Sequence, residues 1–267
     1  MNIISDNHYD LKRKKDFFLS QKPFPHIHLR NFFKEDFFKN FSTSQIDIKK
    51  EEKNLFTTEF ENKKWISKNT DLPVLTKKII EELNSQLWIN NLKELTGIGA
   101  LIGTKVGNTK LANYHEMQAG GLLSPHVDHS SDPETGFPHV LNIVVYLTDS
   151  WKMEWGGGTD LLDSKGKKIK KKLPYIPNSA IIFLHTPYSF HGVSKISEEA
   201  NQIRKSIYVD YYSFDLDPYK HINLDFDNKW FEHGTYFVPK NLLSLLKNKN
   251  RLYLKIFLDY IINKIFK

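Results

Sequence analysis

The 267-residue chain contains no cysteine. This absence excludes disulfide bonds, thiolate nucleophiles and cysteine-ligated zinc or iron–sulfur sites. A bound metal ion must therefore be held by histidine, aspartate or glutamate. Residues 1–16 also lack the charged segment and apolar run of a secretion signal, and they contain no lipidation motif. We therefore expect a cytoplasmic protein.

A phosphate-binding loop is missing as well. No Lys-Ser or Lys-Thr pair follows the glycines Gly156-Gly157-Gly158 into a helix, so nucleotide hydrolysis is not expected.

An uninterrupted apolar run that could span a membrane is also absent. The apolar segment at residues 251–267 is broken by Lys255, Asp259 and Lys264, and no transmembrane segment is expected. This segment instead predicts an amphipathic helix. The helix could pack on its own domain, form a homodimer contact or lie on a membrane surface.

Positive charge exceeds negative charge in this chain, with a formal net charge of +7 and a sequence pI of 9.2. Such a balance attracts nucleic acid, anionic lipid or acidic metabolites, but a general bias toward Lys, Asn, Ile and Phe also explains it. The densest basic run, residues 165–172, lies between two strand-like segments and predicts a hairpin tip. It is either a solvated loop or a contact for a substrate or polyanion. Nucleic acid is not the favoured partner.

Hydrophobic residues make up 40% of the chain and aromatic residues 13%, enough for one sizeable core. Residues 23–29 predict a strand, and residues 31–38 predict a helix. Over residues 71–92, apolar side chains recur on one helical face, which predicts one long helix. These apolar positions are Leu72, Leu75, Ile79, Leu83 and Leu87.

From about residue 98 onward, short β-branched and aromatic runs alternate with Gly, Pro, Asn and Asp, which predicts many short strands. We predict an α+β fold with a double-stranded β-helix, or jelly roll, because this fold brings distant strands together across a cavity. In this division, residues 1–94 brace the core with a strand and helices, residues 95–214 form it, and residues 215–267 add a helical extension. The expected strands span residues 100–105, 110–117, 140–147, 159–162, 180–184, 193–194 and 206–213.

Five side chains in the predicted core indicate a metal site beside an anion site. His126 and Asp128 are two residues apart, so on a strand they share one face. With His191 from a later segment they supply two imidazoles and one carboxylate, the ligand set of non-heme Fe(II) oxygenases. Arg204 and Ser206 share a strand face in the same way, and a guanidinium recognises a carboxylate through two parallel hydrogen bonds.

Other histidines near these strands are less strongly indicated as site residues. His129 points to the opposite face from Asp128 if the strand continues, so it is not expected to bind the metal ion. His115, His139 and His185 border the predicted strands. They could orient the metal ligands, or they could be ordinary core or surface residues.

With these motifs the chain resembles the 2-oxoglutarate and Fe(II)-dependent oxygenases, in particular their prolyl 4-hydroxylase-like branch. The resemblance covers roughly residues 95–214, with a weaker likeness at residues 23–27. Its blocks stand in the family's order: residues 111–114, His126-Val127-Asp128, residues 144–151, residues 155–161, residues 181–184, His191-Gly192-Val193 and residues 204–207.

This resemblance implies that His126, Asp128 and His191 bind Fe(II) and that Arg204 binds the distal carboxylate of 2-oxoglutarate. Tyr146 would donate its hydroxyl to the same carboxylate. Dioxygen would be the second co-substrate, with ascorbate as an additional reductant. Further residues expected to contact the co-substrate are Asn142, Ser206 and Tyr114, although the gap between Tyr114 and His126 is longer than the family usually has.

The implied reaction is hydroxylation of a C–H bond with release of succinate and CO2. Asp128 favours hydroxylation over halogenation, because halogenating relatives have a small residue at this position. Peptidyl proline, another amino acid or a glycan-type small molecule would be the substrate. The alternative is a jelly-roll module that binds a metal ion or a sugar without turnover. A nucleic-acid demethylase is less favoured, because Lys205-Ser206 follow Arg204 where demethylases continue into a longer motif with a second arginine.

Overall fold

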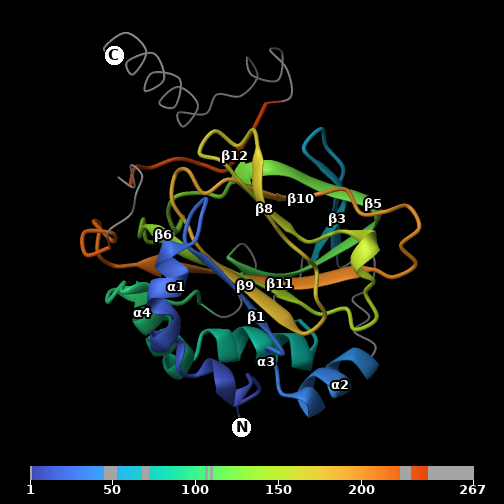
Figure 1. The fold of residues 1–267 in the computed structure, drawn as a ribbon, viewed down its shortest axis with the longest axis horizontal. Helices are drawn as coiled ribbons and strands as arrows, with labels where there is room; N and C mark the ends of the chain where they lie inside the picture. Colours follow the sequence, from blue (N-terminus) through green and yellow to red (C-terminus); the bar gives the residue numbers. More distant parts are fainter. Residues whose placement is uncertain are drawn as a thin grey trace.

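The computed structural model describes residues 2–44, 53–67, 72–105, 108, 111–222 and 230–239. Its centre is a double-stranded β-helix in which antiparallel strands enclose a cavity, and helices cover one outer face (Figure 1). The predicted α+β class and jelly-roll core are therefore confirmed. None of the described helices is both long and apolar enough to cross a membrane.

One continuous antiparallel sheet folds over on itself to form the β-helix, and β5 (Ala112–Val127) divides it into two halves that we call the first and the second sheet. The first runs in the order β1 (His26–Arg30), β9 (Ser179–Leu184), β6 (His139–Tyr146), β11 (Arg204–Ser213) and β5. The second continues from β5 through β10 (His191–Val193) and β7 (Thr159–Leu162) to β8 (Ile169–Leu173). Shorter strands extend these sheets: β2 (Lys53–Phe56), β3 (Glu61–Ser67), β4 (Leu101–Ile102) and β12 (Tyr236–Phe237).

Strand β5 belongs to both sheets, and this double membership closes the fold. Its first half pairs with β11, and its second half pairs with β10 and β12. Between the halves, Gly120 has a φ of 76°, a conformation that favours glycine. A Cβ on the next residue, Gly121, would lie 2.7 Å from the carbonyl oxygen of Gln118. The two glycines therefore let one strand change direction, so that it extends well beyond the expected residues 110–117.

Four helices lie along the outer face of the first sheet; in Figure 1, α2 and α3 are below the strands and α1 and α4 are at the left. They are α1 (Lys15–Ser20), α2 (Glu35–Thr43), α3 (Val74–Leu83) and α4 (Gln86–Thr96), and short 3-10 turns occur at Asp6–His8, Leu11–Lys14 and Met153–Trp155. Trp88 and Leu92 of α4 pack in one buried cluster with Ile143 and Val209 of the sheet. These apolar side chains cover the outer face of the sheet. Because side chains alternate along a strand, the polar residues of β6 and β11 lie on the opposite face, toward the cavity.

The long helix predicted for residues 71–92 is wrong, because the structure has two helices there. The side chain of Ser85 caps α4 by accepting a hydrogen bond from the backbone N–H of Trp88. The neighbouring Asn84 uses its side-chain oxygen to accept from the backbone N–H of Thr104 at 2.7 Å. These local hydrogen bonds outweigh the apolar periodicity, and Leu87 is left half exposed.

The basic run at residues 165–172 forms the turn and the first part of β8 at the edge of the second sheet. Its lysines are exposed, as expected for a solvated hairpin. Charged side chains on an edge strand also hinder pairing with another chain. The amphipathic helix predicted for residues 251–267 lies outside the described residues.

Acidification is expected to destabilise the fold in part through His28 of β1. Burial lowers the pKa of His28 to about 4, and the nearby charges of Arg30 and His26 act in the same direction. Because an unfolded histidine has a pKa near 6.5, this contribution to stability is full above pH 6.5 and declines as the pH falls toward 4. When the pH is lowered from 7 to 4.5, the free energy of unfolding of the unmodified protein should fall by up to about 2 kcal/mol more than that of His28→Gln. Urea denaturation at the two pH values measures this difference. Equal losses in the two proteins would show that His28 is not buried in its neutral form.

Candidate active site

A cavity of about 290 Å³ lies between the two sheets. Side chains from β5, β6, β7, β9, β10 and β11 line it, and residues of β3 and of the segment around β12, which we call the rim, line it as well. His126, Asp128, His191, Arg204, Ser206 and Asn142 all face this cavity. The fold therefore brings six of the eight predicted site residues to one place.

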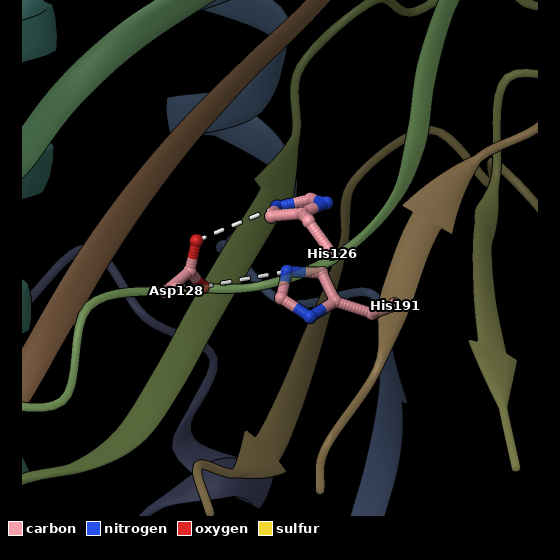
Figure 2. Close-up of side chains that lie close together, drawn as sticks. All are labelled: His126, Asp128 and His191. Carbon is pink, nitrogen blue, oxygen red and sulfur yellow. Dashed lines mark ion pairs between the residues drawn. The ribbon is translucent and has the colours of Figure 1, made fainter. Parts of the chain in front are cut away.

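His126 and His191 are direct cross-strand partners of β5 and β10. Their ring centroids are 4.3 Å apart, although 64 residues separate them in the chain. Asp128 follows immediately after the end of β5. Its Oδ1 lies 3.4 Å from Nε2 of His126, and its Oδ2 lies 3.4 Å from Nε2 of His191 (Figure 2). The three side chains point toward one another, and each contributes an atom to a group that could hold one metal ion.

The protonation pattern of the two imidazoles fits a metal ion. Nδ1 of His126 donates a hydrogen bond to the carbonyl oxygen of Ser124 at 2.9 Å, and Nδ1 of His191 donates to that of Ser189 at 3.1 Å. Because a carbonyl can only accept, the proton of each neutral ring sits on Nδ1 and the Nε2 lone pair faces Asp128. Backbone carbonyls that fix the tautomer in this way are typical of histidine metal ligands.

The charge state of the group also suits a divalent cation. Burial lowers the pKa of His191 to about 4, with His126 adding to the effect, so this imidazole is neutral at pH 7. Burial by itself would raise the pKa of Asp128, but His191 and His126 outweigh it and hold that pKa well below its usual value. Two neutral imidazoles and one carboxylate are the donor set of non-heme Fe(II) sites.

Aromatic rings hold both imidazoles in place. The ring of Phe237 stacks on His126 with centroids 5.1 Å apart, and Phe60 stacks on Phe237 from the other side. Phe183 lies 4.7 Å from His191. These contacts limit the rotation of the ligands and reduce the access of water to them.

Gly192, which follows His191, allows β10 to approach β5 closely. A Cβ at this position would lie 2.8 Å from the backbone oxygen of Leu123 and 3.3 Å from the nitrogen of Pro125. Gly192→Ala should therefore push β10 away from β5 and displace His191. We expect a loss of metal affinity of at least about 10-fold in equilibrium dialysis, comparable with the loss of a residue that orients a ligand.

Gly99→Ala is the matched control for this substitution, because a Cβ on Gly99 would meet no atom within 4 Å. Both variants should keep their far-ultraviolet circular dichroism. If Gly192→Ala binds the metal ion as tightly as Gly99→Ala, the close approach of the two strands is not needed for the site.

Arg204 forms the second part of the site. Its side chain is only 3% exposed, and its guanidinium lies over the rings of Tyr146 and Tyr175, 5.2 and 5.4 Å from their centroids. Its Nε donates to the carbonyl oxygen of Gly157 at 2.5 Å. Gly157 has a φ of 72°, so the glycine-rich turn after Trp155 presents this carbonyl. Within the described part of the chain, no carboxylate forms an ion pair with Arg204. A buried guanidinium that lines a cavity and has no anionic partner is suited to bind an anionic ligand.

Ser206 and Tyr146 lie next to this arginine, as predicted. The hydroxyl of Ser206 accepts a hydrogen bond from Nη1 of Arg204 at 3.0 Å. The hydroxyl of Tyr146 is 2.7 Å from that of Thr159, which lines the cavity. Burial raises the pKa of Tyr146 although Arg204 lowers it, so the phenol keeps its proton. Two polar groups, the hydroxyl of Ser206 on β11 and that of Tyr146 on the neighbouring strand β6, therefore lie near the guanidinium.

Two predicted co-substrate contacts have other partners in the structure. Nδ2 of Asn142 donates to Oδ2 of Asp128 at 3.0 Å and lies 3.3 Å from Oδ1 of Asp210, so Asn142 contacts the carboxylate of the candidate metal-binding group. Tyr114 lies on the face of β5 that packs against the helices, and its hydroxyl donates to Glu116. Since neighbouring residues of a strand face opposite sides, Tyr114 is outside the cavity and His115 is inside it.

Four further residues that line the cavity are not among the eight predicted site residues. Thr159 lies in the block of residues 155–161 but was given no role there, and Lys64 comes from a short strand without a distinctive motif. His115 packs against Tyr208, and burial lowers its pKa well below the ordinary value. His129 faces the cavity, contrary to the prediction from alternation. The reason is that β5 ends at Val127, so the alternation of strand faces no longer applies at His129.

The comparison with protein families supports the resemblance seen in the motifs. Residues 109–212 match the model of the 2OG-Fe(II) oxygenase superfamily. This range contains His126, Asp128, His191 and Arg204. No curated protein sequence matches the chain.

Solved structures with the same fold include a prolyl-4-hydroxylase from Pseudomonas putida, with a TM-score of 0.55 and 13% identity over 76% of this chain and 98% of that one. A prolyl hydroxylase from Trichoplax adhaerens, in complex with a hypoxia inducible factor peptide fragment, has a TM-score of 0.53 and 14% identity over 78% and 91%. HygX from Streptomyces hygroscopicus, with nickel, 2-oxoglutarate and hygromycin B bound, has a TM-score of 0.50 and 8% identity over 84% and 97%. The resemblance to this superfamily and to its prolyl-hydroxylase-like fold is thus confirmed.

Proposed function

Because residues 109–212 match the 2OG-Fe(II) oxygenase superfamily, we propose that this chain is a dioxygenase that hydroxylates a C–H bond of its substrate. Decarboxylation of 2-oxoglutarate to succinate and CO2 would accompany the hydroxylation. The proposal rests mainly on one structural observation. A single cavity contains both a His-Asp-His donor group and a buried arginine without a carboxylate partner among the described residues.

His126, Asp128 and His191 would hold the ferrous ion. When bound there, iron would allow dioxygen to oxidise both 2-oxoglutarate and the C–H bond of the substrate. Arg204 would bind the distal carboxylate of 2-oxoglutarate, because its guanidinium is fixed by Gly157 and Ser206. The hydroxyl of Tyr146 would turn from Thr159 to donate to the same carboxylate. Asn142 would keep Asp128 oriented, and Phe237 and Phe183 would limit the access of water.

The substrate would enter past the rim formed by β3 and the residues around β12. Glu61 and Lys64 of β3 form an ion pair of 2.8 Å there, so the rim is polar and carries both signs of charge. Peptidyl proline, another amino acid and a glycan-type small molecule are all compatible with such a rim. Proteins with this fold act on different substrates because their loops differ, so the fold does not select among the three.

A jelly-roll module that binds a metal ion or a sugar without turnover is the competing function. A structural metal ion has no need of a buried guanidinium beside it, and Arg204 therefore favours the enzyme. The match to an oxygenase superfamily favours it too.

The test is an anaerobic titration of the metal-free protein with Fe(II) and then with 2-oxoglutarate. We expect a visible charge-transfer absorption that needs both additions, and succinate after dioxygen is admitted. Ascorbate should extend the number of turnovers. If neither the absorption nor succinate appears while the protein still binds Fe(II), the chain is a binding module.

Screening 2-oxoglutarate turnover against peptide, amino-acid and sugar pools would then identify the substrate class. A division of the chain at residues 94/95 and 214/215, a cytoplasmic location and a homodimer contact through residues 251–267 complete the proposal. Each can be checked independently of turnover, by limited proteolysis, cell fractionation and sedimentation respectively.

A further inference from the structure

A second group of metal-ligand side chains lies at the end of the cavity away from Arg204. It consists of His129 in the segment after β5, His139 at the start of β6 and Asp210 in β11. One donor atom from each residue lies within 4.8 Å of the other two. His129 and Asp210 line the cavity, so a small ion can reach the group from solvent.

The distances within this group leave room for an ion. Nε2 of His129 is 3.8 Å from Oδ2 of Asp210, and Nε2 of His139 is 3.8 Å from Oδ1 of the same carboxylate. Both separations are too long for a hydrogen bond. Ligand atoms about 2.0–2.2 Å from a shared zinc ion are roughly 3–3.5 Å apart, so each of these two separations would have to shorten by a few tenths of an ångström. The corresponding separations in the group of His126, Asp128 and His191 are 3.4 Å.

The orientation of His139 points to a ligand. Its Nδ1 donates a hydrogen bond to the carbonyl oxygen of His129 at 2.9 Å, so the unprotonated Nε2 faces Asp210. His139 is fully buried, and its Nε2 has no hydrogen-bond partner among the described residues. A buried acceptor left without a partner is costly, and coordination of a metal ion would satisfy it.

Charge in this part of the cavity also favours a cation. Asp210 is 3% exposed, and within the described ranges no lysine or arginine pairs with it. A single amide group, that of Asn142, contacts both Asp128 and Asp210. Two buried carboxylates on one amide repel each other unless a cation or a proton neutralises one of them. An ion at Nε2 of His129 would have to displace the hydroxyl of Tyr212, which lies 2.8 Å from that nitrogen.

We propose that His129, His139 and Asp210 form a second site for a divalent transition-metal ion such as Zn²⁺ or Fe²⁺, separate from the site of His126, Asp128 and His191. Two imidazoles and a carboxylate are donors that such ions prefer. The ion would tie the segment after β5 to β6 and β11, beside Asn142 and hence beside Asp128. This inference goes beyond the proposed oxygenase activity and does not require it.

Counting bound ions tests this proposal without any turnover measurement. Metal-free protein would be dialysed against Zn²⁺ alone, in the absence of 2-oxoglutarate, and its metal content measured by elemental analysis. His139→Gln and Asp210→Asn should each bind one ion per chain fewer than the unmodified protein. His221→Gln, which changes an exposed histidine outside both groups, should bind the same number. If His139→Gln and Asp210→Asn fold and bind as many ions as the unmodified protein, the second site does not exist.

A second measurement covers the case in which these buried substitutions disturb folding. His126→Ala disables the first site, and its visible absorption with Co²⁺ then reports on the remaining site. Adding His129→Gln to His126→Ala changes a side chain that is 27% exposed and should remove this absorption. An absorption that is absent from His126→Ala alone, or unchanged by His129→Gln, would overturn the assignment. Neither outcome would affect the proposed oxygenase site.

Discussion

Replacing His191 with alanine is expected to lower succinate formation by at least about 100-fold. Loss of a residue that merely orients a metal ligand already lowers metal affinity or activity by about 10–100-fold. The substitution removes one of three donor atoms and leaves the carboxylate of Asp128 beside a single imidazole, that of His126. The affinity for Fe(II) at this site should fall together with turnover. Both effects would be measured on the same preparation, by anaerobic titration and by assay of succinate.

His221→Gln provides the control for His191→Ala, because His221 is exposed and lies outside the cavity. It should keep full turnover. His191→Ala should also retain the ion of the proposed second site, so a remaining equivalent of metal does not contradict the prediction. Undiminished succinate formation by folded His191→Ala would refute the assignment of His191 as an iron ligand.

The second large effect is expected from Arg204→Ala. This change removes the buried guanidinium that would meet the distal carboxylate of 2-oxoglutarate, and truncating one partner of a buried charge pair costs about 2–5 kcal/mol. We therefore expect the dissociation constant of 2-oxoglutarate to rise on the order of 100-fold. The affinity for Fe(II) should stay unchanged, because no atom of Arg204 belongs to the metal-binding group. Isothermal titration of the metal-loaded protein with 2-oxoglutarate measures this difference.

Two further variants show whether the guanidinium itself is responsible. Arg204→Lys keeps the charge but cannot form two parallel hydrogen bonds, so it should restore only part of the affinity. Ser206→Ala removes one hydrogen bond to Nη1 of Arg204 and should weaken binding by about 10-fold or less. If Arg204→Ala binds 2-oxoglutarate as tightly as the unmodified protein, the carboxylate is bound elsewhere.

Motifs in the sequence were sufficient to select His126, Asp128, His191 and Arg204, which the structure places around one cavity. Each of these residue types has few substitutes for its task, and the spacing of His126 and Asp128 depends only on the local backbone. The β-rich core was equally predictable, because short apolar runs between turn residues are local features. The break at Ser85 shows the limit of such patterns, since one capping hydrogen bond divided a continuous apolar face into two helices.

Strand pairing decided which of the other side chains line the cavity. Tyr114 and His115 are neighbours in the chain, but the register of β5 against β11 sends the first to the helical side and the second into the cavity. His129 approaches His139 and Asp210 because β5 ends before it, which no alternation rule anticipates.

The amino-acid sequence by itself thus determined which donor atoms and which charge this protein can offer to a metal ion and an organic acid. Only the tertiary structure decided that His126 stands opposite His191, that Arg204 is buried without a carboxylate partner in the described residues, and that a second group of ligands gathers around Asp210. The physical reason is that residue types and spacings are properties of short segments, whereas the separation of side chains from distant segments depends on how the strands pair and bend.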